Sequence, residues 1–97
     1  MDKLSTVDRE TKLKKFLENG WLLDETRDSI TKEFQFKNFI EAFSWMTKIA
    51  FWAEKINHHP EWFNVYRNVT VVLTTHDVKG LSSLDLELAS KMDSEAA

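Results

Sequence analysis

Residues 38–76, NFIEAFSWMTKIAFWAEKINHHPEWFNVYRNVTVVLTTH, decide the fold, because the spacing of their apolar side chains changes once from helical to extended. Over residues 38–57 the apolar side chains recur every three or four positions, which predicts a long helix. Pro60 disfavours the helical conformation in the residue before it, so we expect the helix to end near Asn57 or His58. The alternating residues beyond Pro60 predict two strands, 62–66 and 69–76, that form a hairpin.

The flanking segments supply two further helices and a second hairpin. Residues 5–19 predict a first helix, and the runs 21–23 and 29–36 predict a pair of strands. Near the end of the chain, Ser82 and Asp85 have the spacing of a helical capping box. The order helix-strand-strand-helix-strand-strand-helix predicts an α+β fold, a four-stranded antiparallel sheet with three helices on one face.

The composition limits both the size and the chemistry of the protein. We expect residues 1–97 to form one domain. Cysteine is absent, which excludes disulfides, thiol catalysis and thiolate metal sites. The formal net charge of −3 disfavours direct binding to nucleic acid, which requires neutralisation of phosphates. No apolar run approaches the roughly 20 residues that span a bilayer, and the N-terminus has no secretory pattern. We therefore expect an intracellular, cytoplasmic protein without a membrane partner.

Apolar side chains cover about half of the circumference of the 38–57 helix, more than packing on one sheet requires. One row consists of Phe39, Phe43, Met46, Ala50 and Ala53. A second row consists of Trp45, Ile49, Trp52 and Ile56. Deep burial of the whole helix is the alternative, but a short chain has little else to cover both rows. We predict that the tryptophan row mediates self-association, as a homodimer or homotetramer.

All three histidines of the chain, His58, His59 and His76, fall in this same region. Histidine exchanges protons near neutral pH more readily than other side chains. With Arg67-Asn68 as the hairpin turn, His59 lies opposite His76 on the paired strand. Glu54 precedes His58 by four residues, which places both on one side of the last helical turn. The pattern predicts an acid–base cluster.

Two other interpretations of the histidines remain open from the residues alone. His58 at a helix C-terminus is a common structural use of a positive charge, and His59 and His76 then form an exposed cross-strand pair. Three neutral imidazoles also suit zinc with one position left open. Adjacent histidines usually point in different directions, however, and no His-x-x-x-His pair is present.

Residues 54–66, EKINHHPEWFNVY, followed by TTHD at 74–77, closely resemble the pterin-4a-carbinolamine dehydratase family. The likeness extends from Gly20-Trp21 to Leu88-Ala89-Ser90. The resemblance implies a hydro-lyase that removes water from 4a-hydroxytetrahydropterin and gives quinonoid dihydropterin, in tetrahydrobiopterin recycling. The reaction delivers a proton to the departing 4a-hydroxyl and takes one from ring N5. The resemblance implies no metal and no organic cofactor.

The resemblance also assigns roles to individual residues. It implies catalytic histidines at positions 58, 59 and 76, with Glu54 as their supporting carboxylate. We expect His58 and His76 to flank the 4a-centre and His59 to hold the pterin. The substrate-contact segments map to Asn57, His58, His59, Thr74, Thr75, His76 and Asp77.

Two positions depart from animal members of the family, and one further function follows from the resemblance. Asn57 stands where some animal members have Asp, and Leu84 stands where they have Arg. Some animal members are also dimerisation cofactors of a homeodomain transcription factor. A non-catalytic cofactor with a transcription-factor partner and a nuclear pool is therefore the alternative function.

Overall fold

The long helix predicted from the period of residues 38–57 is α3, Phe39–Ile56, in the computed structural model, which describes residues 1–97. At its start, the side-chain oxygen of Asn38 accepts a hydrogen bond of 2.9 Å from the backbone N–H of Glu41. At its end, Asn57 adopts the left-handed conformation with φ of 53°. Asparagine tolerates this conformation better than most residues. The helix therefore ends where Pro60 predicts.

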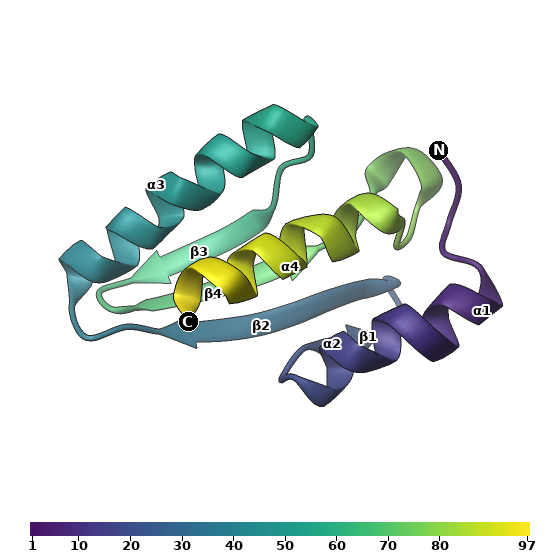
Figure 1. The fold of residues 1–97 in the computed structure, drawn as a ribbon, viewed down its shortest axis with the longest axis horizontal. Coiled ribbons are helices and arrows are strands. Elements are labelled where there is room, and N and C mark those ends of the chain that lie inside the picture. Colours follow the sequence, from purple (N-terminus) through teal and green to yellow (C-terminus); the bar gives the residue numbers. More distant parts are fainter.

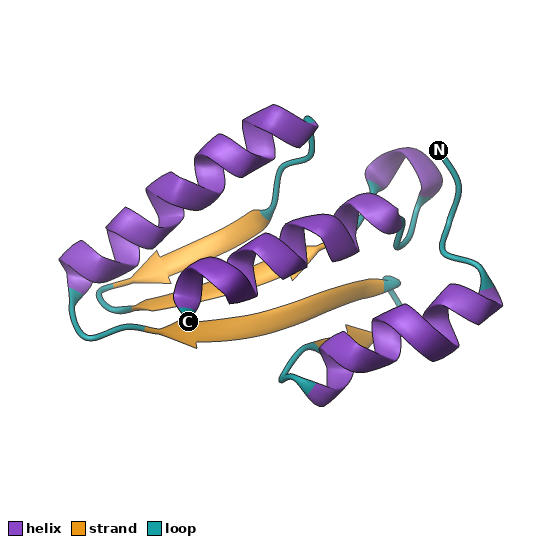
Figure 2. Ribbon diagram, in the orientation of Figure 1, coloured by secondary structure: helices purple, strands orange, loops and turns teal.

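The remaining elements confirm the α+β prediction. The N-terminal helix consists of α1 (Thr6–Asp8), a π-helical turn (Arg9–Leu13) and α2 (Lys14–Glu18), and the C-terminal helix is α4 (Ser83–Ala96). The strands are β1 (Leu22–Asp24), β2 (Ser29–Gln35), β3 (Glu61–Val65) and β4 (Asn68–Leu73). They form one antiparallel sheet in the order β1-β2-β4-β3, with the helices on one face (Figures 1 and 2). No helix combines the length and the apolarity needed to cross a membrane.

The core lies between this face of the sheet and the helices. Val69, Val71 and Leu73 alternate along β4 and are fully buried, as their period of two predicts. Trp45 of α3 packs on the ring of Phe34 at a centroid distance of 4.6 Å. Its indole N–H donates a 3.1 Å hydrogen bond to the backbone oxygen of Met92 in α4. Aromatic packing and this bond together fix α3 and α4 against the sheet.

The prediction that the tryptophan row mediates self-association is wrong. Trp45 and Ile49 are 3% and 0% exposed within a single chain. The other two members of that row, Trp52 and Ile56, are half-buried against the same core. The large exposed apolar side chains of α3 are instead Phe39, Ile40, Phe43 and Phe51. Periodicity identifies two apolar faces of the helix, but only the position of the sheet decides which face becomes core.

The predicted hairpin turn is also displaced. Val65 pairs with Asn68, so the turn consists of Tyr66-Arg67 rather than Arg67-Asn68. Asn64 stabilises the observed turn, because its side-chain amide donates to the backbone oxygens of Tyr66 (3.1 Å) and Asn68 (2.9 Å). With this register, and with β3 beginning only at Glu61, the predicted pairing of His59 with His76 across the strands does not occur.

Asp28, in the turn between β1 and β2, joins three parts of the chain. Its carboxylate accepts two hydrogen bonds of 2.8 Å from the guanidinium of Arg9 in the N-terminal helix. The same carboxylate accepts the backbone N–H of Leu81, and its backbone oxygen accepts the hydroxyl of Thr74, both at 3.0 Å. The hydrogen bonds from Arg9 lower the pKa of the Asp28 carboxyl. Asp28 thus anchors both ends of the loop between β4 and α4.

Replacing Gly80 by alanine tests how closely this loop packs on Asp28. A Cβ at Gly80 would lie less than 3.0 Å from Oδ2 of Asp28, which Arg9 holds in place. We expect Gly80→Ala to lower the free energy of unfolding by about 1–3 kcal/mol, measured by urea denaturation. The cost should be clearly smaller in an Asp28→Ser background, where the carboxylate is gone and only the flexible end of Lys3 lies near the added Cβ. Equal costs in both backgrounds would rule out the clash as the cause.

Candidate active site

A polar cavity of about 350 Å³ opens where β4 ends, beside the start of β3 and the end of α3. It is lined by Asn57, His58, His59, Pro60, Glu61, Val72, Thr74, Thr75, His76 and Asp77. All seven residues expected to contact substrate are therefore in its wall. Glu54 is not in the wall, but it reaches one of the histidines.

His58 is the buried histidine of the cavity. The left-handed residue Asn57 ends α3 and lets the backbone N–H of His58 donate to the carbonyl oxygen of Ala53 at 3.0 Å. The side chain turns inward, is 10% exposed, and places Nε2 2.6 Å from Oδ1 of Asp85, which is fully buried in the first turn of α4. The predicted pairing of Glu54 with His58 is wrong, because the left-handed residue interrupts the helical spacing on which it depends.

Glu54 pairs with His59 instead. Its Oε1 lies 2.6 Å from Nε2 of His59, and the two side chains are 79% and 57% exposed. Water competes for both partners at such exposure, so the pair is loosely held. Glu54 therefore supports the exposed histidine at the entrance of the cavity.

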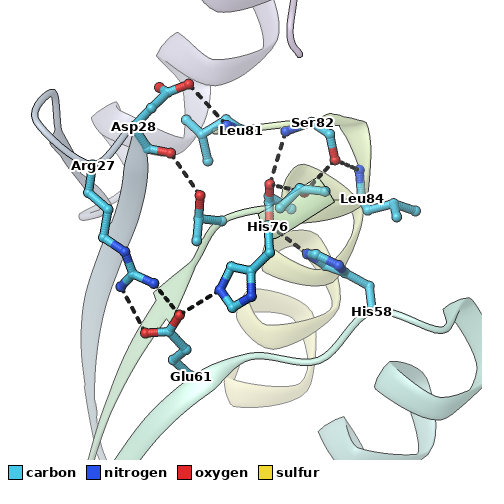
Figure 3. A network of polar contacts seen from close by, with 11 residues as sticks. Arg27, Asp28, His58, Glu61, His76, Leu81, Ser82 and Leu84 are labelled. Atoms are coloured by element: carbon cyan, nitrogen blue, oxygen red, sulfur yellow. Dashed lines mark hydrogen bonds and ion pairs between the residues drawn. The ribbon is translucent and has the colours of Figure 1, made fainter. Parts of the chain in front are cut away.

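His76 forms a third pair, with Glu61 (Figure 3). Its Nε2 lies 3.1 Å from Oε2 of Glu61, the first residue of β3. Both oxygens of Glu61 also accept hydrogen bonds from the guanidinium of Arg27 in the β1–β2 turn. The hydrogen bond from Arg27, followed by that from His76, lowers the pKa of the Glu61 carboxyl from 4.5 to about 2. Glu61 is thus ionised at neutral pH and presents a negative charge to the His76 ring.

The three imidazoles share one pattern: each directs Nε2 at its own carboxylate. The pairs differ in burial, because Asp85 is fully buried whereas Glu61 and Glu54 are 43% and 79% exposed. No group of three or more histidine, cysteine, aspartate or glutamate side chains is arranged to hold a metal ion. The geometry suits proton transfer, because a carboxylate orients an imidazole and stabilises its protonated form.

Sequence reasoning missed three of the residues that build this site. The spacing predicts Asp85 only as part of a helix cap, although a capping carboxylate retains a second oxygen for another donor. Glu61 lies within the motif that carries the family resemblance, directly after Pro60. Arg27 lies 34 residues before Glu61 in a polar turn. Nothing in the sequence predicts that this turn reaches the cavity.

The fold and the site define a small α+β protein with three histidine–carboxylate pairs at a cavity at the end of its sheet. The model of the family described as pterin 4 alpha carbinolamine dehydratase matches residues 2–95. A Roseobacter denitrificans protein provisionally named pterin-4-alpha-carbinolamine dehydratase is 60% identical over 95 residues, 98% of this chain and 97% of that one.

Two further relatives agree. Pterin-4-alpha-carbinolamine dehydratase of Drosophila melanogaster is 52% identical over 94 residues, 97% of this chain and 49% of the fly protein. The crystal structure of a transcriptional coactivator/pterin dehydratase from Brucella melitensis superposes with a TM-score of 0.85 at 39% identity, covering 98% of this chain and 99% of that one. This chain belongs to the pterin-4a-carbinolamine dehydratase family.

The interaction between Arg27 and Glu61 predicts how stability depends on pH. The pKa of Glu61 is lowered by folding, so its contribution to stability is present above pH 4.5 and is lost as the pH falls toward about 2. We expect the urea midpoint of the wild type to fall more steeply between pH 4.5 and about 2 than the midpoint of Glu61→Gln, because the variant has no titrating group at position 61. Arg27→Gln should flatten the curve in the same way, because Arg27 is the main cause of the shift. Parallel curves for the three proteins would contradict the prediction.

Proposed function

We propose that this protein removes water from 4a-hydroxytetrahydropterin by histidine acid–base catalysis and gives quinonoid dihydropterin, in tetrahydrobiopterin recycling. The observation that carries the proposal is the convergence of His58, His59 and His76 on one cavity, each paired through Nε2 with a carboxylate. Membership of the pterin-4a-carbinolamine dehydratase family supports the substrate class.

The proposed reaction needs only proton transfers. One proton goes to the hydroxyl on C4a, the C–O bond breaks, and water leaves. A second proton leaves N5, and its electron pair forms the C4a–N5 double bond. Placed imidazoles carry out both transfers at neutral pH, and the proposal requires no metal or organic cofactor. The cavity, of about 350 Å³, lies within the range of small-molecule sites.

The three histidines take different roles in this proposal. His58 and His76 come from different elements, from the end of α3 and from the loop after β4, and in this proposal they approach the 4a-centre from two sides. His59 and its partner Glu54 are both more than half exposed, which suits holding the heterocycle at the entrance rather than proton transfer. Asn57 stands where some animal members have Asp; its backbone ends α3, so in this proposal the difference leaves the histidines in place.

Alanine variants of the histidines test the proposal. We expect His58→Ala and His76→Ala each to lower the rate of 4a-hydroxytetrahydropterin dehydration by about 10²–10⁴-fold, the usual contribution of a placed acid or base. His59→Ala should raise KM more than it lowers kcat. Circular dichroism establishes that each variant is folded. Wild-type rates in folded His58→Ala or His76→Ala would contradict the assignment, and loss of wild-type activity on adding a chelator would favour a metal instead.

We also propose that the chain associates with a second copy through the outer face of α3. Phe39, Ile40, Phe43 and Phe51 are 45–75% exposed on this helix. Large apolar side chains gathered on one exposed face are typical of an association surface. None of the four lines the cavity, so association and proton transfer use separate residues.

The same face carries a second candidate function, that of a dimerisation cofactor for a homeodomain transcription factor. The observation that favours it is the similarity to the Brucella melitensis protein, whose name includes transcriptional coactivator. A partner helix would cover the exposed side chains of α3 in place of a second copy of the chain. Sizing the protein alone and with a candidate partner separates the two.

Charge placed on this face tests the association. We expect the double variant Phe43→Glu, Phe51→Glu to elute as a monomer of 11.4 kDa, measured by size exclusion with light scattering, while the wild type is larger. The matched control is Val7→Glu, because Val7 is also exposed (66%) but lies on the N-terminal helix. The control should keep the wild-type mass. An unchanged mass in the double variant would exclude the outer face of α3.

A further inference from the structure

We infer that Asp85 is a positioning residue for His58: it fixes the imidazole with its proton on Nε2 and leaves Nδ1 facing the cavity as the proton-accepting atom. The catalytic consequence of this inference rests on the proposed function. The contact between Asp85 and His58 does not depend on the proposed function, because it is a property of the folded chain.

The surroundings of Asp85 are those of a buried, fully hydrogen-bonded carboxylate. The residue is 0% exposed. Its Oδ2 accepts the backbone N–H of Ser82 at 2.9 Å and the hydroxyl of Thr75 at 2.7 Å, and its Oδ1 faces Nε2 of His58 at 2.6 Å. A buried negative charge is tolerated only when donors surround it, and these three donors meet that need.

The neighbouring hydrogen bonds all lead to the Asp85 carboxylate, and Figure 3 draws this network around His58 and Ser82. The hydroxyl of Thr75 donates to Asp85, so the contact of 2.6 Å between Thr75 and Ser82 is donated by the Ser82 hydroxyl. The Ser82 oxygen in turn accepts the backbone N–H of Leu84. Every donor in this chain points toward the carboxylate. A carboxylate only accepts hydrogen bonds, so Nε2 of His58 donates to Oδ1 and carries the hydrogen.

The other ring nitrogen of His58 is open to the cavity. Nδ1 takes part in none of the side-chain hydrogen bonds that His58 makes. Oδ1 of Asn68 is the single buried side-chain nitrogen or oxygen atom that has no hydrogen-bond partner. Nδ1 of His58, which also has no partner, is therefore accessible to solvent. Since His58 lines the cavity, Nδ1 is accessible from there. The neutral ring thus presents a lone pair to a bound ligand, and Asp85 stabilises the imidazolium that forms when the ring takes a proton.

The other two histidines lack this constraint. Glu54 and Glu61 are 79% and 43% exposed, so water can replace each of them as a hydrogen-bond partner. The imidazole rings of His59 and His76 are then free to turn. His58 alone is held by a fully buried carboxylate, whereas Glu61 and its own partner Arg27 are 43% and 44% exposed. Thr75 contributes to this rigidity, since it lines the cavity while its hydroxyl points away from it to Asp85.

The decisive variant is Asp85→Asn. Its side-chain oxygen is retained by Ser82 and Thr75, so its NH₂ group faces Nε2 of His58 and donates to it, which moves the ring proton to Nδ1. We expect kcat for dehydration to fall by about 10²–10⁴-fold with little change in KM, as for loss of a placed base. Long-range ¹H–¹⁵N spectra of the neutral ring should show a protonated Nε2 in the wild type and a protonated Nδ1 in Asp85→Asn.

Two controls separate positioning from a general structural role. Asp93→Asn makes the same change on the same helix, where Asp93 pairs with Lys32 at 2.7 Å and is 17% exposed. This variant should leave kcat and the His58 tautomer unchanged. At position 75, Thr75→Val should lower kcat, because one donor to Asp85 is lost. Thr75→Ser keeps the hydroxyl, so its kcat should stay close to that of the wild type.

The wild-type spectrum alone tests the inference even if Asp85→Asn does not fold. A neutral His58 protonated on Nδ1 in the wild type would overturn it, as would a folded Asp85→Asn with wild-type kcat. A wild-type chain that shows protonated Nε2 but no dehydration of 4a-hydroxytetrahydropterin would support the positioning by Asp85 and contradict the proposed function.

Discussion

Three chain segments meet at the buried carboxylate of Asp85, and the site depends on that meeting. Asp85 caps the start of α4 through Ser82, holds the loop after β4 through Thr75, and binds His58 at the end of α3. A buried charge requires all of these donors at once, because each missing donor costs free energy in a low-dielectric interior. The packing of α4 and the orientation of His58 therefore depend on the same set of hydrogen bonds to Asp85.

The β1–β2 turn closes the opposite side of the cavity by a different kind of interaction. Asp28 holds both ends of the loop after β4, through Thr74 and Leu81, and the adjacent Arg27 holds Glu61 against His76. These contacts are partly exposed and charged, so water and pH weaken them more than they weaken the contacts of Asp85. The cavity thus has one wall held by buried contacts and one held by partly exposed, charged contacts.

The long helix α3 connects the core to the cavity. Its aromatic face packs on Phe34 and the sheet, which fixes where the helix ends, and Asn57 then turns the chain so that His58 points inward. Its other apolar face remains outside, over Phe43 and Phe51. One helix therefore contributes to the core, positions His58 and leaves an apolar surface exposed.

The order of the elements, the α+β class, the end of α3 before Pro60, the capping box at Ser82 and the gathering of the histidines follow from the sequence alone. These features depend on local periodicity, capping and proline geometry, which short segments carry by themselves. Only the tertiary structure decided that Asp85 rather than Glu54 pairs with His58, that Arg27 reaches Glu61, and that the tryptophan face of α3 is core. The contacts of Asp85 with His58 and of Arg27 with Glu61 join residues far apart in the chain. The direction of His58 also depends on one left-handed residue, Asn57. Local spacing of residues encodes neither long-range contacts nor such a change of direction.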